Sequence, residues 1–296
     1  MPLDEKDFHG LEQIAPLAVL HSPGQASAMP TYPELVALER PAVLNKYVLA
    51  RGPRKLTLES SSVCNLRCVM CPQALGLVQR PKHLEDSLLD KIQPALRGLE
   101  WVQLHGIGEP LFSPAFWRAL EVLDSLPPMH ITVNSNMTVI TDEQIGKILN
   151  SQLEEISVSL DAATPETYAK IRGYDLNRVI DNIKRLIARR KAVGRERPKI
   201  LPNMTLMREN IEELEAFVEL GHRLGVQGVG FWQLNPGEDY RITKDDGWIF
   251  DYQKQMLRNH ARLSNERIRA AVALGERLGI PIIMDPSKDL YFAEAV

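Results

Sequence analysis

The chain has 296 residues, of which 44% are hydrophobic and 25% are charged. This composition is that of an ordinary soluble globular protein, and the length is sufficient for a full hydrophobic core. Lysine and arginine together number 35 against 38 aspartate and glutamate residues, which gives a net charge of -3. The chain therefore has no overall positive field that would attract nucleic acid or an anionic membrane.

The compartment is indicated by what the sequence lacks. No segment is long and apolar enough to span a membrane, and the first residues lack the basic start and apolar run of a signal peptide. The three cysteines lie close together and form no even set of pairs, which argues for a reducing compartment. We therefore expect a cytoplasmic protein with neither a membrane nor a nucleic-acid partner.

Regular structure is predicted from Lys55 onward. Residues 1–50 are interrupted by Pro-Gly and Met-Pro pairs and show no sustained periodicity, which predicts an N-terminal arm. After the arm, short β-type runs alternate with amphipathic helical runs. The predicted strands are 55–59, 101–104, 130–133, 155–160, 200–206 and 226–234. The predicted helices are 85–97, 114–126, 142–149, 176–193 and 210–224.

Six successive β-then-α units predict an α/β fold, a partial (β/α)6 TIM-like barrel with a parallel sheet and right-handed crossovers. A long helical stretch is expected from about residue 248 to residue 278, with 280–284 as a further strand. We thus expect three parts: the arm at 1–50, a core barrel at 51–240 and a helical C-terminal extension at 241–296. Functional side chains of such a barrel gather at the carboxyl ends of its strands.

The fourth predicted strand separates apolar from polar side chains. Alternate residues of a strand point to opposite faces. One face carries Ile156, Val158 and Leu160, and the other carries Ser157, Ser159 and Asp161. The third strand and the residues after it repeat this pattern, with one face that carries His130, Thr132, Asn134 and Asn136. Buried hydroxyl and carboxylate groups are costly without partners, so the polar faces predict a wet or ligand-filled interior.

The cysteines carry the strongest chemical signal. Cys64, Cys68 and Cys71 form a C-x3-C-x2-C pattern directly after the first predicted strand. Three thiolates at this spacing can bind three irons of a 4Fe-4S cluster and leave the fourth iron open for chemistry. A structural zinc site that uses His83 or His105 as fourth ligand is the alternative, although such sites usually have a second C-x2-C pair, which this sequence lacks.

The cysteine pattern resembles the cluster loop of the radical SAM enzyme superfamily, and four further segments resemble motifs of that family in the same order. They are Gly106-Ile107-Gly108-Glu109-Pro110 (G-x-GEP), Ser135-Asn136 (the T-N-G turn), Ser159-Leu160-Asp161 (S-x-D) and Ile171-Arg172-Gly173 (iRG). The resemblance covers about residues 55–235 and is closest to the branch related to SPASM and twitch enzymes. Met137 stands where the T-N-G turn usually has glycine, so a different backbone is expected there.

The resemblance implies that S-adenosylmethionine binds beside a 4Fe-4S cluster held by the three cysteines. It implies that Glu109 accepts hydrogen bonds from the cofactor's amino group and that Arg172 binds its carboxylate. The S-x-D segment is implied to hold hydroxyl groups of the cofactor. The implied cofactor contacts are Gly106, Gly108, Glu109, Pro110, Asn136, Ser159, Asp161 and Arg172.

The function implied by the resemblance is that of a radical enzyme. A reductase, flavodoxin or ferredoxin is expected to reduce the cluster, which cleaves the cofactor to a 5'-deoxyadenosyl radical. This radical is expected to abstract hydrogen from an unidentified substrate, a peptide or a small molecule. The alternative is a non-catalytic iron-sulfur binding or sensing protein on the same fold, which would not need the G-x-GEP, S-x-D and arginine segments together.

The sequence does not narrow the expected reaction further. No cysteine follows Cys71, whereas many relatives with the iRG segment carry a cysteine-rich extension for auxiliary clusters. We therefore expect a single-cluster enzyme or a chain that ends early. Epimerisation, dehydrogenation, C-C bond formation, methylation and rearrangement all remain open.

Substrate contacts are expected at the end of the sixth strand. Gln233 and Asn235 end that strand, and Tyr240 and Arg241 follow a Pro-Gly turn. A six-stranded partial barrel leaves a lateral gap between its first and sixth strands, and these residues lie beside it in the predicted fold. A solvated loop is the alternative interpretation of this segment.

Overall fold

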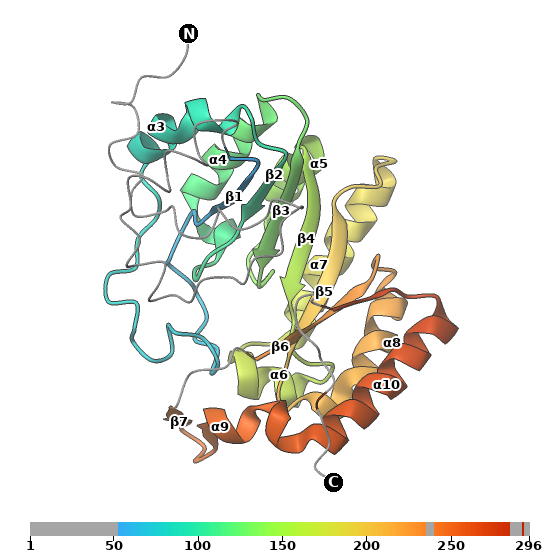
Figure 1. Ribbon diagram of the computed structural model, residues 1–296. Helices are drawn as coiled ribbons and strands as arrows, with labels where there is room; N and C mark the ends of the chain where they lie inside the picture. Colours follow the sequence, from blue (N-terminus) through green and yellow to red (C-terminus); the bar gives the residue numbers. More distant parts are fainter. Residues whose placement is uncertain (1–52, 235–239, 285–291, 293–296) are drawn as a thin grey trace, which may run out of the picture.

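A parallel sheet forms the centre of the molecule (Figure 1). The computed structural model describes residues 53–234, 240–284 and 292, so the expected N-terminal arm lies outside the described residues. The strand order is β1-β2-β3-β4-β5-β6-β9, and each neighbouring pair is parallel. The strands are β1 (Lys55–Leu58), β2 (Trp101–Leu104), β3 (His130–Ser135), β4 (Leu153–Ser159), β5 (Lys199–Leu206), β6 (Val229–Gln233) and β9 (Ile282–Met284).

The strands are connected by helices, as the alternating pattern predicts. The long helices are α3 (Asp86–Leu96), α4 (Pro114–Asp124), α5 (Asp142–Asn150), α7 (Leu176–Ala192), α8 (Leu214–Leu224) and α10 (Ala261–Leu278). Short 3-10 turns are η3 (Pro110–Phe112), η4 (Ile211–Glu213) and η5 (Leu257–His260). Figure 1 shows α8 and α10 side by side next to β6. The predicted α/β barrel architecture is confirmed.

Helix α6 (Pro165–Arg172) was not predicted. It begins with Thr164, whose hydroxyl accepts a hydrogen bond from the Thr167 N–H, and it ends at Gly173 with a left-handed φ of 70°. Such caps define a helix end, but two turns carry too few apolar residues for a clear periodic signal. This short helix places Arg172 at the carboxyl end of the sheet.

The two faces of β4 differ as expected. Ile156 and Val158 are completely buried in the same core as Ile183 and Leu186 of α7. The polar residue Ser157 lies on the opposite face and accepts a hydrogen bond from the side-chain amide of Asn203 on β5. The interior of the partial barrel is therefore lined by polar groups that are bonded to one another.

The helical stretch predicted for 248–278 is wrong in its first part. A small antiparallel pair precedes the helices, made of β7 (Arg241–Thr243) and β8 (Ile249–Asp251), and α9 (Tyr252–Gln255) follows it. Gly247 makes the turn between the two strands with a φ of 83°. The aromatic residues at 248, 250 and 252 recur with a period of two, which is a strand signal.

The sheet has one strand more than the six predicted for the barrel. The further strand expected at 280–284 is confirmed as β9, which pairs with β6. Gly275 of α10 allows this packing, because a Cβ there would lie 2.8 Å from the Cδ1 atom of Ile282. The outer strands are therefore β1 and β9. The expectation of a gap between the first and sixth strands is wrong, because β9 pairs with the free side of β6.

Among the described residues, no helix has the length and apolar character required to cross a membrane.

Candidate active site

The cysteine loop follows β1 and is held by two neighbouring segments. Cys68 is buried, Cys64 and Cys71 are half-buried, and all three thiols are free. The Val69 N–H donates to the Ile171 carbonyl of α6 at 3.0 Å. The Glu109 N–H donates to the Val63 carbonyl at 2.9 Å, which ties the loop to the G-x-GEP segment. The structure thus brings the cysteine, G-x-GEP and iRG segments together.

Nitrogen donors point at two of the cysteine sulfurs. The Leu66 N–H lies 3.4 Å from Cys64 Sγ, and Asn136 Nδ2 lies 3.8 Å from the same atom. Arg172 Nη1 lies 3.6 Å from Cys68 Sγ. Burial raises the pKa of the Cys68 thiol to about 11, and the charge of Arg172 acts against this rise. Donors of this kind stabilise sulfur ligands of iron-sulfur clusters, so the surroundings of the thiols fit such a cluster.

The residues that the structure describes contain no group of three Cys, His, Asp or Glu side chains within reach of a single metal ion. A cubane does not require such a group, because each thiolate binds a different iron. His83, considered as a zinc ligand, has its Nδ1 atom 2.9 Å from the hydroxyl of Ser61.

Glu109 is a buried carboxylate with three donors from the protein. It is 2% exposed, and its Oε1 atom accepts hydrogen bonds from the Leu111 N–H at 3.0 Å and the Ser135 hydroxyl at 2.7 Å. Its Oε2 atom accepts from the Asn136 N–H at 2.7 Å. Burial raises the pKa of Glu109, and these hydrogen bonds oppose the rise. A carboxylate has about four acceptor positions, so one remains for a ligand such as the cofactor's amino group.

We expect Glu109→Gln to lower the free energy of unfolding by about 1 to 3 kcal/mol, because the glutamine NH₂ group faces a donor that the carboxylate accepted. Chemical denaturation of the cluster-free protein measures this change. Glu59→Gln is the matched control: the exposed Glu59 accepts one hydrogen bond, from the Ile107 N–H at 2.6 Å, and glutamine retains an acceptor oxygen for it. Equal losses in both variants would contradict a special role for the Glu109 contacts.

The turn after β3 lies against the cysteine loop. Asn136 Nδ2 donates to Asn65 Oδ1 at 3.1 Å, and Asn136 Oδ1 accepts from the Thr138 N–H at 3.0 Å. Met137 is fully buried and has a φ of 54°, in the region that favours glycine. Methionine thus adopts the left-handed conformation here, and a difference from the backbone of the family's T-N-G turn stays a prediction. Asn65 was not identified from the sequence, although its place directly after Cys64 is the signal that could have found it.

Asp161 and Arg172 bind each other. Arg172 Nε donates to Asp161 Oδ2 at 2.7 Å, and Nη2 contacts the same oxygen. Asp161 Oδ1 accepts from the Thr205 N–H at 2.6 Å. Burial opposes the charge of Arg172, but the Asp161 carboxylate outweighs it and raises the arginine pKa above its ordinary value. Ser159, the last residue of β4, is half-buried and lies two residues before Asp161 in the sequence.

The G-x-GEP segment approaches the cysteine loop closely. A Cβ atom at Gly108 would lie 2.6 Å from the carbonyl oxygen of Val63. Gly106 lies against the side chain of Glu59. Pro110 is buried and begins η3. The two glycines therefore serve close packing, and contact of this segment with the cofactor stays a prediction.

The residues predicted to bind substrate have varied surroundings. Gln233 lines a cavity of about 160 Å³ with Leu206, Met256 and Leu257 among its neighbours. Asn235 lies outside the described residues. Arg241 Nε pairs with Asp251 Oδ2 at 2.8 Å across the β7 and β8 strands. A substrate role for these residues stays a prediction.

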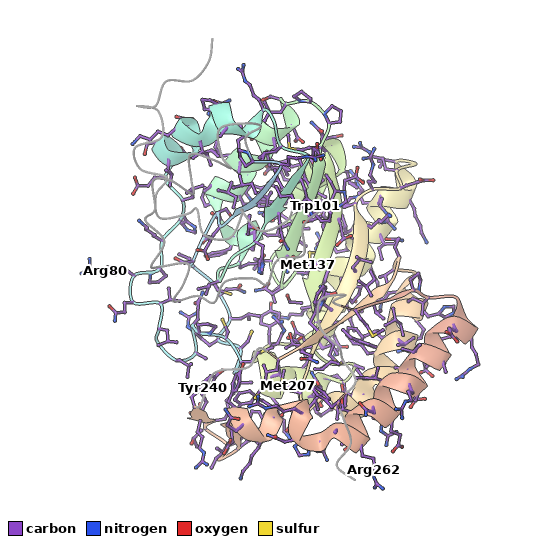
Figure 2. The ribbon with its side chains drawn as sticks, in the orientation of Figure 1. Arg80, Trp101, Met137, Met207, Tyr240 and Arg262 are labelled. Atoms are coloured by element: carbon purple, nitrogen blue, oxygen red, sulfur yellow. The ribbon has the colours of Figure 1, made fainter. Side chains whose placement is uncertain are left out.

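Tyr240 contacts the cysteine loop. Its hydroxyl donates to the Val69 carbonyl at 3.0 Å, and its ring centroid lies 4.8 Å from that of Tyr252. Both residues join an apolar cluster that also contains Val69 and Met207. Figure 2 shows Tyr240 and Met207 at the same end of the molecule, far from Trp101. The segment after β6 thereby supports the loop between Cys68 and Cys71.

We expect Tyr240→Phe to lower the free energy of unfolding by about 0.5 to 1.5 kcal/mol, because the Val69 carbonyl loses one hydrogen bond while the ring packing remains. Tyr240→Ala removes the ring as well and should cost more. Denaturation of both variants measures the difference. If the phenylalanine variant were as unstable as the alanine variant, the hydroxyl rather than the ring would dominate this contact.

Known proteins with similar sequences include a maturase and a cyclase. A mycofactocin maturase, MftC, of Mycobacterium tuberculosis is 26% identical over 261 residues, which span 81% of this chain and 64% of the relative. A GTP 3',8-cyclase of Chlorobaculum tepidum is 27% identical over 189 residues, 62% of this chain and 54% of the relative. The chain thus spans less than two thirds of the length of these relatives.

Solved structures show the same fold. The crystal structure of Streptococcus suis SuiB bound to S-adenosylmethionine superposes with a TM-score of 0.60 at 18% identity, over 82% of this chain and 52% of SuiB. The family model of the radical SAM superfamily matches residues 58–221, which contain the cysteine, G-x-GEP, S-x-D and iRG segments and make up more than half of the chain. The chain therefore belongs to the radical SAM superfamily.

Proposed function

We propose that the protein is an S-adenosylmethionine-dependent radical enzyme whose 4Fe-4S cluster is held by Cys64, Cys68 and Cys71. The observation that carries the proposal is the convergence of these thiols, two of them faced by nitrogen donors, with the G-x-GEP and iRG segments. When bound, the reduced cluster supplies one electron for cleavage of S-adenosylmethionine to methionine and a 5'-deoxyadenosyl radical, which abstracts hydrogen from the substrate.

The residues of the chain position and enclose this chemistry. Glu109 fixes the G-x-GEP segment against the end of β3 and retains an acceptor position for the cofactor's amino group. Ser159 is half-buried at the carboxyl end of β4, where a hydroxyl can bind the cofactor. The buried loop around Cys68 limits access of water.

The proposal also includes a substrate class, an electron donor and a compartment. A peptide substrate is supported by the fold, which is shared with SuiB, a protein crystallised with its precursor peptide SuiA. A small-molecule substrate is the second candidate, as one relative is a GTP cyclase. A reductase, flavodoxin or ferredoxin is the proposed donor, and the cytoplasm is the proposed compartment because an oxygen-sensitive cluster requires reducing surroundings.

The proposed division of the chain places the radical chemistry in residues 51–240 and a C-terminal extension in 241–296. The cysteine motif and the four further family segments lie in the first part. Strand β9 of the extension returns to the edge of the sheet, and Phe250 and Tyr252 share an apolar cluster with Val69 of the cysteine loop. The extension therefore supports the core structurally.

Anaerobic incubation with S-adenosylmethionine and dithionite tests the function. We expect 5'-deoxyadenosine to form even without substrate, as measured by liquid chromatography, and deuterium transfer to identify substrates among candidate peptides and nucleotides. A variant with all three cysteines replaced by alanine is the control. An intact cubane that yields no 5'-deoxyadenosine would instead support the non-catalytic iron-sulfur alternative.

A further inference from the structure

The side chain of Arg172 connects a buried carboxylate to a cysteine sulfur. Two of its nitrogens, Nε and Nη2, contact Asp161 Oδ2, and the third, Nη1, lies 3.6 Å from Cys68 Sγ. We propose that Arg172, anchored by Asp161, is a positioning residue that sets the reduction potential of the cluster bound through Cys68. The inference rests on the proposed function, since it requires that cluster.

The arginine is held in one orientation. Asp161 Oδ1 accepts the Thr205 N–H at 2.6 Å, and the Asp161 carbonyl accepts from Asn210 Nδ2 at 2.9 Å. Thr205 therefore fixes the carboxylate and Asn210 fixes the backbone of the same residue, and the carboxylate fixes two guanidinium nitrogens in turn. The planar guanidinium then has a defined direction for Nη1, which is toward Cys68.

Burial makes this charge effective. Arg172 is 8% exposed and Asp161 is 1% exposed, so little water is available to screen the pair. Reduction adds one electron from the donor to the cluster and makes its charge more negative by one. A cation that hydrogen-bonds to a ligand sulfur stabilises the reduced form, and hydrogen bonds to sulfur are among the features that set cluster potentials.

Substitution of each residue of the pair is expected to shift the reduction potential of the cluster, in opposite directions. Arg172→Gln leaves the Asp161 carboxylate uncompensated near the cluster, so the reduction potential should shift to a more negative value. Asp161→Asn leaves the arginine charge uncompensated, so the potential should shift to a more positive value. Asparagine accommodates the left-handed φ of 58° at this position, which keeps the backbone change small.

The double variant Arg172→Gln with Asp161→Asn removes both charges and should give a potential between those of the single variants. Lys170→Gln is the matched control. Lys170 lies on the same helix and the substitution removes the same charge, but its side chain is 44% exposed and pairs with Glu209. Solvent screens that charge, so the potential should stay at the wild-type value.

The measurement is a redox titration monitored by electron paramagnetic resonance on cluster-loaded protein without S-adenosylmethionine, so that cofactor contacts contribute nothing. Opposite shifts in the two single variants support the proposal. An unchanged potential in Arg172→Gln overturns it. If that variant binds no cluster, a more positive potential in Asp161→Asn supports the proposal, and an unchanged or more negative one overturns it. Folded variants that both fail to bind a cluster would assign the pair to cluster assembly and also overturn it. Failure of the wild type to bind a cubane would instead contradict the proposed function, before any variant is compared.

Discussion

Replacing any one of Cys64, Cys68 and Cys71 by alanine should abolish binding of the 4Fe-4S cluster. The sequence contains three cysteines, so no other thiol is present to replace a lost ligand. The half-buried Cys64 and Cys71 and the buried Cys68 are free in the structure, and removal of one small side chain should leave the fold intact. Iron analysis is expected to give about four irons per chain for the wild type and a large loss in each variant.

Two controls separate ligand loss from unfolding in this experiment. Circular dichroism of the cluster-free variants should match that of the wild type. Ser62→Ala changes a half-buried loop residue near Cys64 whose hydroxyl hydrogen-bonds to the Lys82 backbone, and this variant should retain the iron. Full iron content in a single cysteine variant, or stoichiometric zinc without visible absorption in the wild type, would contradict the assignment.

The architecture was predictable because its signals are local and periodic. Each predicted strand from 55–59 to 226–234 overlaps an observed strand of the sheet, as β-type runs alternate with amphipathic helices. The exception is β8, where the alternating aromatic residues give a strand signal over a three-residue strand that precedes a long helical pattern. Pairing with Arg241–Thr243, which joins residues apart in the sequence, completes this strand.

The site was predictable in its residues but less so in its contacts. The motifs identified Glu109, Asp161 and Arg172, yet the hydrogen bonds from Arg172 to Asp161 and from Ser135 to Glu109 depend on backbone geometry. Asp161 has a left-handed φ of 58°, which a strand-like sequence pattern does not reveal. Residues predicted to contact a ligand are thus also bound by the protein itself, and this prior binding orders them before a ligand arrives.

Gly108→Ala should destabilise the protein by more than about 3 kcal/mol and prevent cluster binding. The new Cβ would lie 2.6 Å from the Val63 carbonyl oxygen and closer still to the Ser61 carbonyl oxygen. Both are backbone atoms of the loop that leads to Cys64, and the Gly108 N–H donates to the Ser61 carbonyl at 3.1 Å. Relief of the clash therefore requires displacement of the cysteine loop from the G-x-GEP segment. Denaturation and iron content together measure the effect.

Gly106→Ala is the matched comparison, two residues earlier in the same segment. Its Cβ would meet atoms of the Glu59 side chain, including Cδ at 2.6 Å, and no backbone atom is among the nearest contacts. Glu59 is exposed and can rotate away at the cost of its hydrogen bond from the Ile107 N–H, about 1 kcal/mol. The cluster should therefore remain bound in this variant. Equal loss of iron in both variants would mean that the segment tolerates no side chain at either glycine, and that backbone contact with the cysteine loop is not the decisive constraint.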